Sequence, residues 1–383
     1  MARKLKSDPM LFLATLLLIG LSIVMVYSAS AVVTAERYGR PSMFLVKQAM
    51  WAVLGLGLLG LVMRIDYRTY REPVFIWTSL VIVLGALVAV LFMPPVNSAR
   101  RWFGIAGIGV QPSEVSKLVA ILFIAALLER RAHRINELAY AVAPIALLIG
   151  CLFALIMLEP DFGTSLALAL IAFVMVFAAG LNYRYIVGAA LVGLPALYIL
   201  VMGTAYRRRR MLTFLNPWED PLGDGFQIIQ SLIAIGTGGV WGKGLMNGAQ
   251  KLFYLPEPHT DFIYSVISEE LGLVGATAVL VCFCVVTWRG VRVALRAPDA
   301  FGAYLAFGLT TMIALQAFIN ISVVLGMMPT KGIPLPLVSF GGSSLLINLV
   351  GMGILLNVSQ HATSSTVSTS LRASTGPTAA GHE

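Results

Sequence analysis

Charged residues are scarce in this sequence: they make up 12% of its 383 residues, whereas 58% are hydrophobic. The mean hydropathy of +0.86 excludes a soluble globular domain of this size. Cysteine is also rare, and Cys151, Cys282 and Cys284 all lie inside apolar runs. That placement excludes structural disulfides and a zinc site. We therefore expect a membrane protein with reduced cysteines.

Histidine occurs only four times, and no two histidines stand at the spacing of metal ligands, which argues against a metal site built on a histidine cluster. The net charge of +9 could suggest nucleic acid as a partner. However, the 27 Lys and Arg residues fall mostly in short connectors between apolar runs. The positive-inside rule of membrane proteins predicts this placement, whereas a nucleic-acid surface does not, so we expect no nucleic acid.

Ten apolar runs are long enough to predict membrane-spanning helices, at about 20 residues per crossing. The predicted fold is thus an all-α polytopic membrane protein. The first run is too long for a signal peptide and should remain in the mature chain. The predicted spans are residues 10–31, 43–63, 74–93, 113–128, 138–158, 163–181, 184–203, 262–288, 301–328 and 338–360.

An even number of spans places both termini on one side, and the basic residues predict which side. A cytoplasmic N-terminus gives the cytoplasmic segments fourteen Lys and Arg residues, against five in the short outer loops. The cytoplasmic set is Arg3, Lys4, Lys6, Arg64, Arg68, Arg71, Arg130, Arg131, Arg134, Arg184, Arg289, Arg292, Arg296 and Arg372, and the outer set is Arg37, Arg40, Arg100, Arg101 and Lys331. We therefore expect a multi-pass protein of the cytoplasmic membrane with both termini inside.

Residues 1–360 are predicted to form a single transmembrane domain, with a large extracytoplasmic loop at 204–261 between the seventh and eighth spans. The tail, residues 361–383, is rich in Ser and Thr and lacks apolar periodicity. Such a composition is typical of disorder.

The string QPSEVSK, residues 111–117, predicts a helix start with Glu114 in the first turn. Lys117 follows at a spacing that allows an ion pair with Glu114 on one helix face. Two interpretations stay open: a cap with an intrahelical ion pair, or a lysine one turn below the outer surface that binds an anion.

The segment GIPLPLVSFGGSS, residues 332–344, contains Pro334, Pro336, Gly341 and Gly342, which together forbid a continuous helix. Broken backbone at membrane depth must line a cavity or be buried in protein. Lys331 stands at its start, and the tenth span should begin near Ser343. With the predicted topology, the fourth, sixth, eighth and tenth spans all start at the outer side, so four positive helix ends could surround one cavity suited to phosphate.

The stretch LPEPHTDFIYSVISEELG, residues 255–272, brings acids into the start of an apolar span. Asp261 could simply cap the helix. A cap does not explain the polar positions that follow at helical spacing, or Glu269 beside them. Glu269 lies roughly 12 Å into the span, where a charge costs on the order of 2.5–3.5 kcal/mol unless it is paired or hydrated. A hydrated or paired cavity wall is the better interpretation.

Two further features are open to more than one interpretation. His259 could be a base, a hydrogen-bond donor or an ordinary loop residue. The RRRR run ending at Arg210 could bind lipid headgroups or attract an anionic substrate. The GTGGVWGKG run, residues 236–244, fails the phosphate-loop pattern, because Thr237 replaces the first glycine and no Ser or Thr follows Lys243.

Several of these strings together resemble the SEDS family (shape, elongation, division and sporulation; the FtsW, RodA and SpoVE proteins). They are ARRW, QPSE with the following Lys117, NPWEDPLGDGFQIIQS, YLPEPHTDF, SEELG and PTKGIPLPLVSFGGSS. The resemblance covers nearly the whole chain from the first to the tenth span. ARRW, PWEDP and TKG are more similar to the division branch, FtsW, or the sporulation branch than to the elongation branch.

The resemblance implies a peptidoglycan glycosyltransferase that polymerises lipid II, an undecaprenyl-diphosphate-linked muropeptide, on the outer face of the cytoplasmic (inner) membrane. It implies a class B penicillin-binding protein, a transpeptidase, as partner, other divisome proteins around it, and work at the division septum. The family's essential aspartate matches Asp261.

The resemblance also suggests roles for the charged residues. Forming a β-1,4 bond from an α-linked diphosphate requires inversion, and Asp261 could take the proton of the attacking hydroxyl. Positive groups must stabilise the diphosphate, and a divalent cation (Mg or Mn) could add to them, although no cofactor is certain. The proposed cations are Lys331, Lys117, Arg101 and Arg210, and Glu114 and Glu269 would orient them; His259 and Ser343 complete the predicted substrate-binding set.

Two other functions stay open. Ten spans with broken helices and intramembrane charges also suit a lipid II flippase. A flippase needs access from both faces, whereas here the polar strings gather at the outer end. The third interpretation is a non-catalytic scaffold for the transpeptidase, with Asp261 as a cap.

Overall fold

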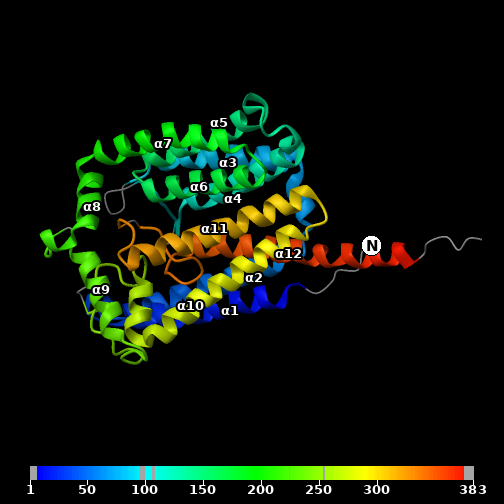
Figure 1. Ribbon diagram of the computed structural model, residues 1–383. Coiled ribbons are helices and arrows are strands. Elements are labelled where there is room, and N and C mark those ends of the chain that lie inside the picture. Colours follow the sequence, from blue (N-terminus) through cyan, green and yellow to red (C-terminus); the bar gives the residue numbers. More distant parts are fainter. Residues whose placement is uncertain are drawn as a thin grey trace, which may run out of the picture.

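The computed structural model describes residues 7–94, 100–105, 108–223, 225–252, 255–330 and 332–374, and these are almost entirely helical. The long helices lie roughly side by side in one bundle (Figure 1). In chain order the elements are α1 Pro9–Tyr38, α2 Met43–Val62, η1 Tyr67–Arg71, α3 Pro73–Val90, β1 Phe103–Ile105, β2 Ile108–Val110, α4 Pro112–Arg131, η2 Ala132–Arg134, η3 Leu138–Val142, α5 Ala143–Leu158, α6 Phe162–Ala178, α7 Tyr183–Met202, α8 Ala205–Leu215, η4 Pro217–Glu219, α9 Phe226–Gly238, α10 Ile263–Leu295, α11 Ala300–Val324 and α12 Gly342–Ser374.

Each predicted span coincides with a helix, and the all-α polytopic class is confirmed. In the described residues, eight helices are long and apolar enough to cross a membrane. The helix α6 is shorter, and α4 carries charges in its first and last turns. The number of ten crossings therefore stays a prediction.

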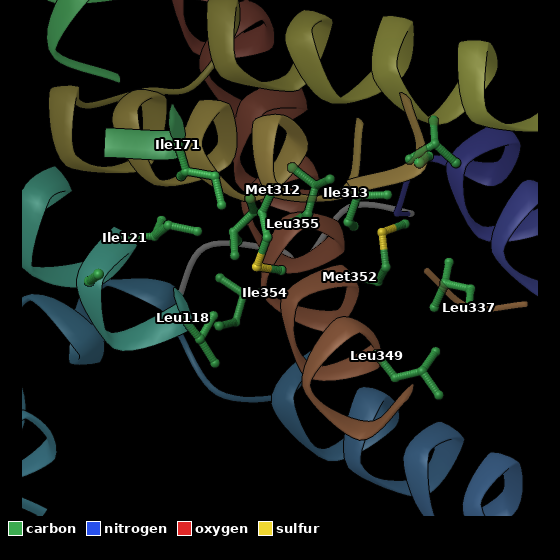
Figure 2. Packing of buried hydrophobic residues seen from close by; sticks show 14 of the residues in the cluster. Leu118, Ile121, Ile171, Met312, Ile313, Leu337, Leu349, Met352, Ile354 and Leu355 are labelled. Carbon is green, nitrogen blue, oxygen red and sulfur yellow. The ribbon is translucent and has the colours of Figure 1, made fainter. Parts of the chain in front are cut away.

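The most deeply buried helices are α4, α11 and α12. Side chains of α4, α6, α11 and α12 meet in the core (Figure 2), where Leu118, Ile121, Met312 and Leu355 are almost completely inaccessible. By contrast, α7 has no buried residue and α3 is mostly exposed. The sequence explains this difference, because α4 carries small and polar residues that suit close helix packing, whereas α3 and α7 are apolar around their circumference.

At one end of the bundle, the start of α1 contacts the late turns of α10 and α12. The α1 N-cap, Asp8, accepts hydrogen bonds from Met10 and Leu11, and its own N–H donates to Ser359 Oγ of α12 at 3.1 Å. Arg289 near the end of α10 forms an ion pair with Asp8. The first residues of α1 and the late turns of α10 and α12 thus share one end, which we call the terminal end. The cytoplasmic side of this end stays a prediction.

The segment predicted as a large loop, residues 204–261, contains α8, η4 and α9. The helix α12 continues to Ser374, into the segment predicted as a disordered tail, and projects beyond the bundle (Figure 1). The disorder of this tail stays a prediction. No Gly or Pro occurs from Ile354 to Ser374, so no residue in this stretch interrupts the helix once it has formed. Residues 375–383 lie outside the described residues.

The helix α10 is broken at Gly272, whose φ of 66° and ψ of −164° are not helical. Residues 239–252, which we call the anchor loop, fill the break. The N–H groups of Leu273 and Val274 donate to the carbonyls of Gly239 and Val240 at 2.9 and 3.2 Å. Backbone groups released by the break are therefore satisfied inside the protein, as a membrane requires.

Candidate active site

Asp261 is held in place through its backbone. The Asn320 side-chain amide of α11 donates to the carbonyl oxygens of Asp261 and Ile333, both at 2.8 Å. Ser339 Oγ donates to the carbonyl of Thr260 at 2.6 Å. The residues before α10 are thus fastened to α11 and to the broken segment between α11 and α12.

The Asp261 side chain is not a helix cap. The N-cap of α10 is Phe262, and no side chain caps this helix. Gly332 lies against the carboxylate instead, since a Cβ on this glycine would stand 3.0 Å from Asp261 Oδ2. The carboxylate is therefore not needed to start the helix.

Asp261 lines a polar cavity of about 230 Å³, together with Arg101, Arg210, Gln227 and Glu257. An apolar cavity of about 370 Å³ adjoins it, and both are lined by Arg101, Arg210, Thr330 and Gly332. The apolar cavity takes its walls from α6, α7 and α8, chiefly Phe162, Leu166, Leu197, Val201 and Met211. We call the residues that line both cavities, Arg101, Arg210, Thr330 and Gly332, the junction. The junction lies between the Asp261 carboxylate and the apolar cavity.

Arg101 and Arg210 give this junction its positive charge, and Arg207 adds to it from the wall of the apolar cavity. Arg101 Nε is buried and has no hydrogen-bond partner among the described residues. Arg210 Nη1 donates to the Thr330 carbonyl at 3.3 Å. The Arg207 guanidinium lies 5.3 Å from the centre of the Phe162 ring. Guanidinium groups bind phosphate strongly, so the junction suits a phosphorylated ligand with an apolar chain.

The electrostatics favour Asp261 as a proton acceptor near neutral pH. Burial raises the pKa of its carboxyl to about 7, with the Glu257 carboxylate acting in the same direction and Arg210 opposing it. A carboxyl with this pKa is about half charged at pH 7, which suits a general base.

Two acids that received no role from the sequence stand beside the junction. Burial, together with the nearby Asp161 carboxylate, raises the pKa of Glu159 to about 8, so Glu159 is mostly neutral at pH 7. Asp161 caps α6 through the N–H of Thr164 at 3.1 Å and accepts the Gln111 side-chain amide at 3.0 Å. The EPDFG string was visible in the sequence, but only the fold brings it to Arg101.

Lys117 and Glu114 form the predicted intrahelical ion pair, at 2.8 Å, and both are buried. Lys117 Nζ also donates to Gln316 Oε1 of α11 at 2.9 Å. Neither residue lines the polar or the apolar cavity. The interpretation of Lys117 as an anion-binding group at the cavity is therefore replaced by an internal ion pair that joins α4 to α11.

Glu269 does not line the Asp261 cavity either, contrary to the predicted cavity wall. Its carboxylate pairs with Lys243 at 2.8 Å and accepts the N–H groups of Ala249 and Gln250 at 2.9 and 3.2 Å. The physical reason is that the anchor loop, rather than water, covers this face of α10. Glu269 is therefore paired, as its depth requires.

Glu270 completes the same network. Its carboxylate accepts Lys251 Nζ at 2.5 Å, Ser28 Oγ at 2.6 Å and the N–H of Met246 at 3.1 Å. Lys251 and Glu270 are both almost completely buried. The acids of the SEELG string thus hold the anchor loop to α10, with α1 as a third partner.

The remaining predicted residues lie elsewhere. The His259 ring packs against Phe44 and Phe340, with ring centroids 4.5 and 5.6 Å away, and it lies beside a third cavity. Burial lowers the pKa of His259, so its imidazole is a neutral packing group. Ser343 is buried and lines neither the polar nor the apolar cavity. Lys331 lies outside the described residues.

Of the four predicted helix starts, two reach the cavities. Phe162 and Gly163 of α6 line the apolar cavity, and Phe262, the N-cap of α10, lines the polar one. Within the described residues, neither cavity is lined by α4 or α12. The expected ring of four positive helix ends is thus replaced by two helix starts and the arginines.

This fold and this site define a polytopic membrane protein in which a carboxylate and three arginines line two adjoining cavities. Residues 9–364 match the family of FtsW, RodA and SpoVE, described as "Cell cycle protein". The chain belongs to this family.

Relatives and solved structures agree with this assignment. The chain is 44% identical over 358 residues to a "Probable peptidoglycan glycosyltransferase FtsW" of Geobacter sulfurreducens, covering 92% of this chain and 95% of the relative. It is 42% identical to "Stage V sporulation protein E" of Bacillus subtilis, covering 94% and 98%. A structure described as "Structural coordination of polymerization and crosslinking by a peptidoglycan synthase complex" superposes with a TM-score of 0.75 at 32% identity, covering 93% of this chain and 98% of that one. Thermus thermophilus RodA gives a TM-score of 0.68 at 29% identity, covering 92% and 96%.

Proposed function

We propose that this chain is a peptidoglycan glycosyltransferase that polymerises lipid II at the outer face of the cytoplasmic membrane, for septal wall synthesis. The observation that carries the proposal is the position of Asp261, whose carboxylate lines a polar cavity that continues, past Arg101 and Arg210, into an apolar one. The names of the relatives support the activity.

In this mechanism the apolar cavity between α6, α7 and α8 takes the first part of the isoprenoid chain. Arg101, Arg207 and Arg210 bind the diphosphate and stabilise the negative charge that grows on it as the glycosidic bond breaks. Asp261, in its charged form, accepts the proton of the acceptor hydroxyl, which attacks the anomeric carbon from the face opposite the diphosphate. Lys331 is proposed as a further cation at the same site.

A divalent cation, Mg or Mn, is also proposed, although the described residues do not supply a complete set of protein ligands for it. In the described part of the chain, no group of three or more His, Cys, Asp or Glu side chains could hold a metal ion. The carboxylates that line the polar cavity are Asp261 and Glu257. We therefore assign the positive charge at the junction to the arginines.

The proposed setting follows the same reasoning. The terminal end faces the cytoplasm, as the distribution of Lys and Arg predicts. The Asp261 cavities lie at the opposite end, because α10 begins beside Asp261 and its late turns carry the Arg289–Asp8 ion pair. The proposed partner is a class B penicillin-binding protein, within the division machinery. The similarity to a peptidoglycan synthase complex that coordinates polymerisation with crosslinking supports a polymerase that works beside a crosslinking enzyme.

The test is polymerisation of lipid II by the purified chain, with and without the transpeptidase. The Asp261→Asn variant should lose about 10²- to 10⁴-fold in rate, the usual contribution of a general base. Glu219→Gln is the matched control, since this exposed acid lies away from the cavities, and it should retain the wild-type rate. If Asp261→Asn polymerises normally, Asp261 is not the base.

The second candidate function, a lipid II flippase, is favoured by the broken helix α10 at membrane depth. Wild-type protein that translocates lipid II in proteoliposomes but makes no glycan, alone or with the transpeptidase, would establish the flippase. A protein that does neither and still binds the transpeptidase would be a scaffold.

A further inference from the structure

A groove lies between α3, α4 and α5, away from Asp261. It has a volume of about 260 Å³. Its walls include Ile76 and Trp77 of α3, Phe123 and Leu127 of α4 and Pro144 of α5, and Arg130 and Arg131 of α4 stand at its rim. We call it the α3–α4–α5 groove.

The groove opens at the terminal end of the bundle. Pro73, the first residue of α3, lines it. The preceding η1 is tied to α12, because the N–H of Tyr67 donates to Asn357 Oδ1 at 3.0 Å. Arg130 and Arg131 occupy the last turn of α4. The groove thus extends from the middle of α4 to the terminal end, whereas the Asp261 cavities lie toward the opposite end of the bundle. With the proposed topology it belongs to the cytoplasmic leaflet.

The walls of the groove are mostly apolar, and Trp77 exposes the groove at the surface of the bundle. Trp77 is 59% exposed and meets Phe123 edge to face, with ring centroids 6.0 Å apart. The helix α3 is mostly exposed and strongly apolar, so its exposed face suits contact with membrane lipid. Tryptophan at this depth is typical of the membrane–water interface. An occupant of the groove must therefore have an apolar chain.

The charges at the groove are of one sign. Among the residues that line it, two are arginines and none is acidic. The adjacent Glu129 is engaged by Arg71 at 2.8 Å, and Glu72, which precedes α3, does not line the groove. An occupant of complementary charge must therefore be anionic.

The two arginines are placed differently. Arg131 donates to the Tyr140 carbonyl at 2.5 Å and lies 4.6 Å from the centre of the Tyr140 ring, so its guanidinium is held against η3. Arg130 is exposed, and within the described residues no hydrogen bond or ion pair holds its guanidinium. A fixed cation beside an exposed one gives two donors for a single phosphate.

We propose that the α3–α4–α5 groove binds an anionic phospholipid of this leaflet. Its phosphate lies on Arg130 and Arg131, and one acyl chain lies along Trp77 and Phe123. Basic pockets between transmembrane helices bind anionic headgroups in this way. A second copy of the chain would place the same two arginines at the contact and repel itself. The proposal does not depend on the glycosyltransferase activity.

The experiment is native mass spectrometry of the full chain, released from detergent after titration with phosphatidylglycerol or with phosphatidylcholine of the same acyl chains. Wild type should retain phosphatidylglycerol more tightly. Arg130→Gln should weaken the binding of phosphatidylglycerol about fivefold and leave the binding of phosphatidylcholine unchanged. A fivefold change corresponds to about 1 kcal/mol, the contribution of one basic residue near an anionic lipid surface. Arg296→Gln is the matched control, since this exposed arginine ends α10 outside the groove, and it should match wild type.

Two further measurements separate the groove from other sources of the effect. Trp77→Ala should weaken the binding of phosphatidylglycerol, because the substitution removes one wall of the groove without touching the arginines. The variant protein should elute as the wild type does. Glycerol phosphate, which has the headgroup but no chain, should not compete. The proposal is overturned if the two lipids bind wild type equally, if Arg130→Gln and Arg296→Gln behave alike, if glycerol phosphate competes as well as the lipid, or if the chain appears as a dimer that Arg130→Gln dissociates.

Discussion

The rate of polymerisation should depend on pH through the carboxyl of Asp261. Burial raises the pKa of this group to about 7, and only its charged form can accept a proton. Activity should therefore rise with pH through neutrality and be lost as pH falls. With this pKa, about nine tenths of the molecules carry the charged carboxylate at pH 8 and about one tenth at pH 6. The expected change is about tenfold.

Two variants should move this transition in opposite directions. The Glu257 carboxylate raises the pKa of Asp261 and the Arg210 guanidinium lowers it. Glu257→Gln should therefore shift the acid limb of the pH profile to lower pH, and Arg210→Gln should shift it to higher pH. The free energy of unfolding should change with pH in the opposite direction to activity. A carboxyl whose pKa is raised on folding stabilises the folded state below its unfolded pKa, and that contribution is lost as pH rises through the folded pKa.

The assay is the initial rate with the transpeptidase from about pH 5.5 to 8.5, at limiting lipid II, so that it reports the pKa of the free enzyme. Asp261→Glu should retain a carboxylate limb at an altered pH, which separates the base from other titrating groups. The reasoning is refuted if the wild-type rate is flat across this range, or if Glu257→Gln and Arg210→Gln shift the limb in the same direction.

Other predictions concern the anchor loop and the junction. Lys251→Met should leave Glu270 charged and buried, which costs about 3–5 kcal/mol. The melting temperature in detergent should therefore fall by several degrees. The double variant Lys251→Met with Glu270→Gln should recover most of this loss, and no recovery would contradict the ion pair. Gly272→Ala should cost at least about 1–3 kcal/mol, because its backbone angles are open essentially to glycine alone; a normal melting temperature and rate would contradict the break in α10. Arg101→Gln should raise the KM for lipid II more than it lowers kcat, and an unchanged KM would remove Arg101 from diphosphate binding.

The long apolar runs of the sequence predicted helices at the expected spans, since such runs leave few alternatives to a spanning helix. They did not predict α8 and α9, which lie inside the segment interpreted as a loop. The ion pair of Glu114 and Lys117 was one of two interpretations open from the sequence, because both partners lie three residues apart on one helix. Asp261 was correctly placed before the eighth span, but its cavity could not be derived from spacing. The arginines that share this cavity come from segments about 50 and 160 residues away in the sequence and meet only in the fold.

The acids of the SEELG string were misplaced for a related reason. Depth in the membrane showed that Glu269 must be paired or hydrated, but not with what. Its partners lie in the anchor loop, whose path depends on positive φ angles at Gly242, Gly244 and Met246. Local propensity does not predict such a path, particularly at a methionine. Lys243, its cationic partner, stood out in the sequence only as part of a failed phosphate loop.

The break at Gly272 separates α10 into two parts with different attachments. Residues 263–271 follow Asp261 and Phe262 and are fastened to the anchor loop, and Glu270 also ties them to Ser28 of α1. The N–H groups just after Gly272 bond outside the helix, so the tilt of residues 263–271 is not inherited from the long part. The anchor loop is bonded to both parts, because Gly239 and Val240 accept hydrogen bonds from Leu273 and Val274 while Lys243 and Lys251 pair with Glu269 and Glu270. The two parts of α10 are thus connected through the loop where the helix itself is interrupted.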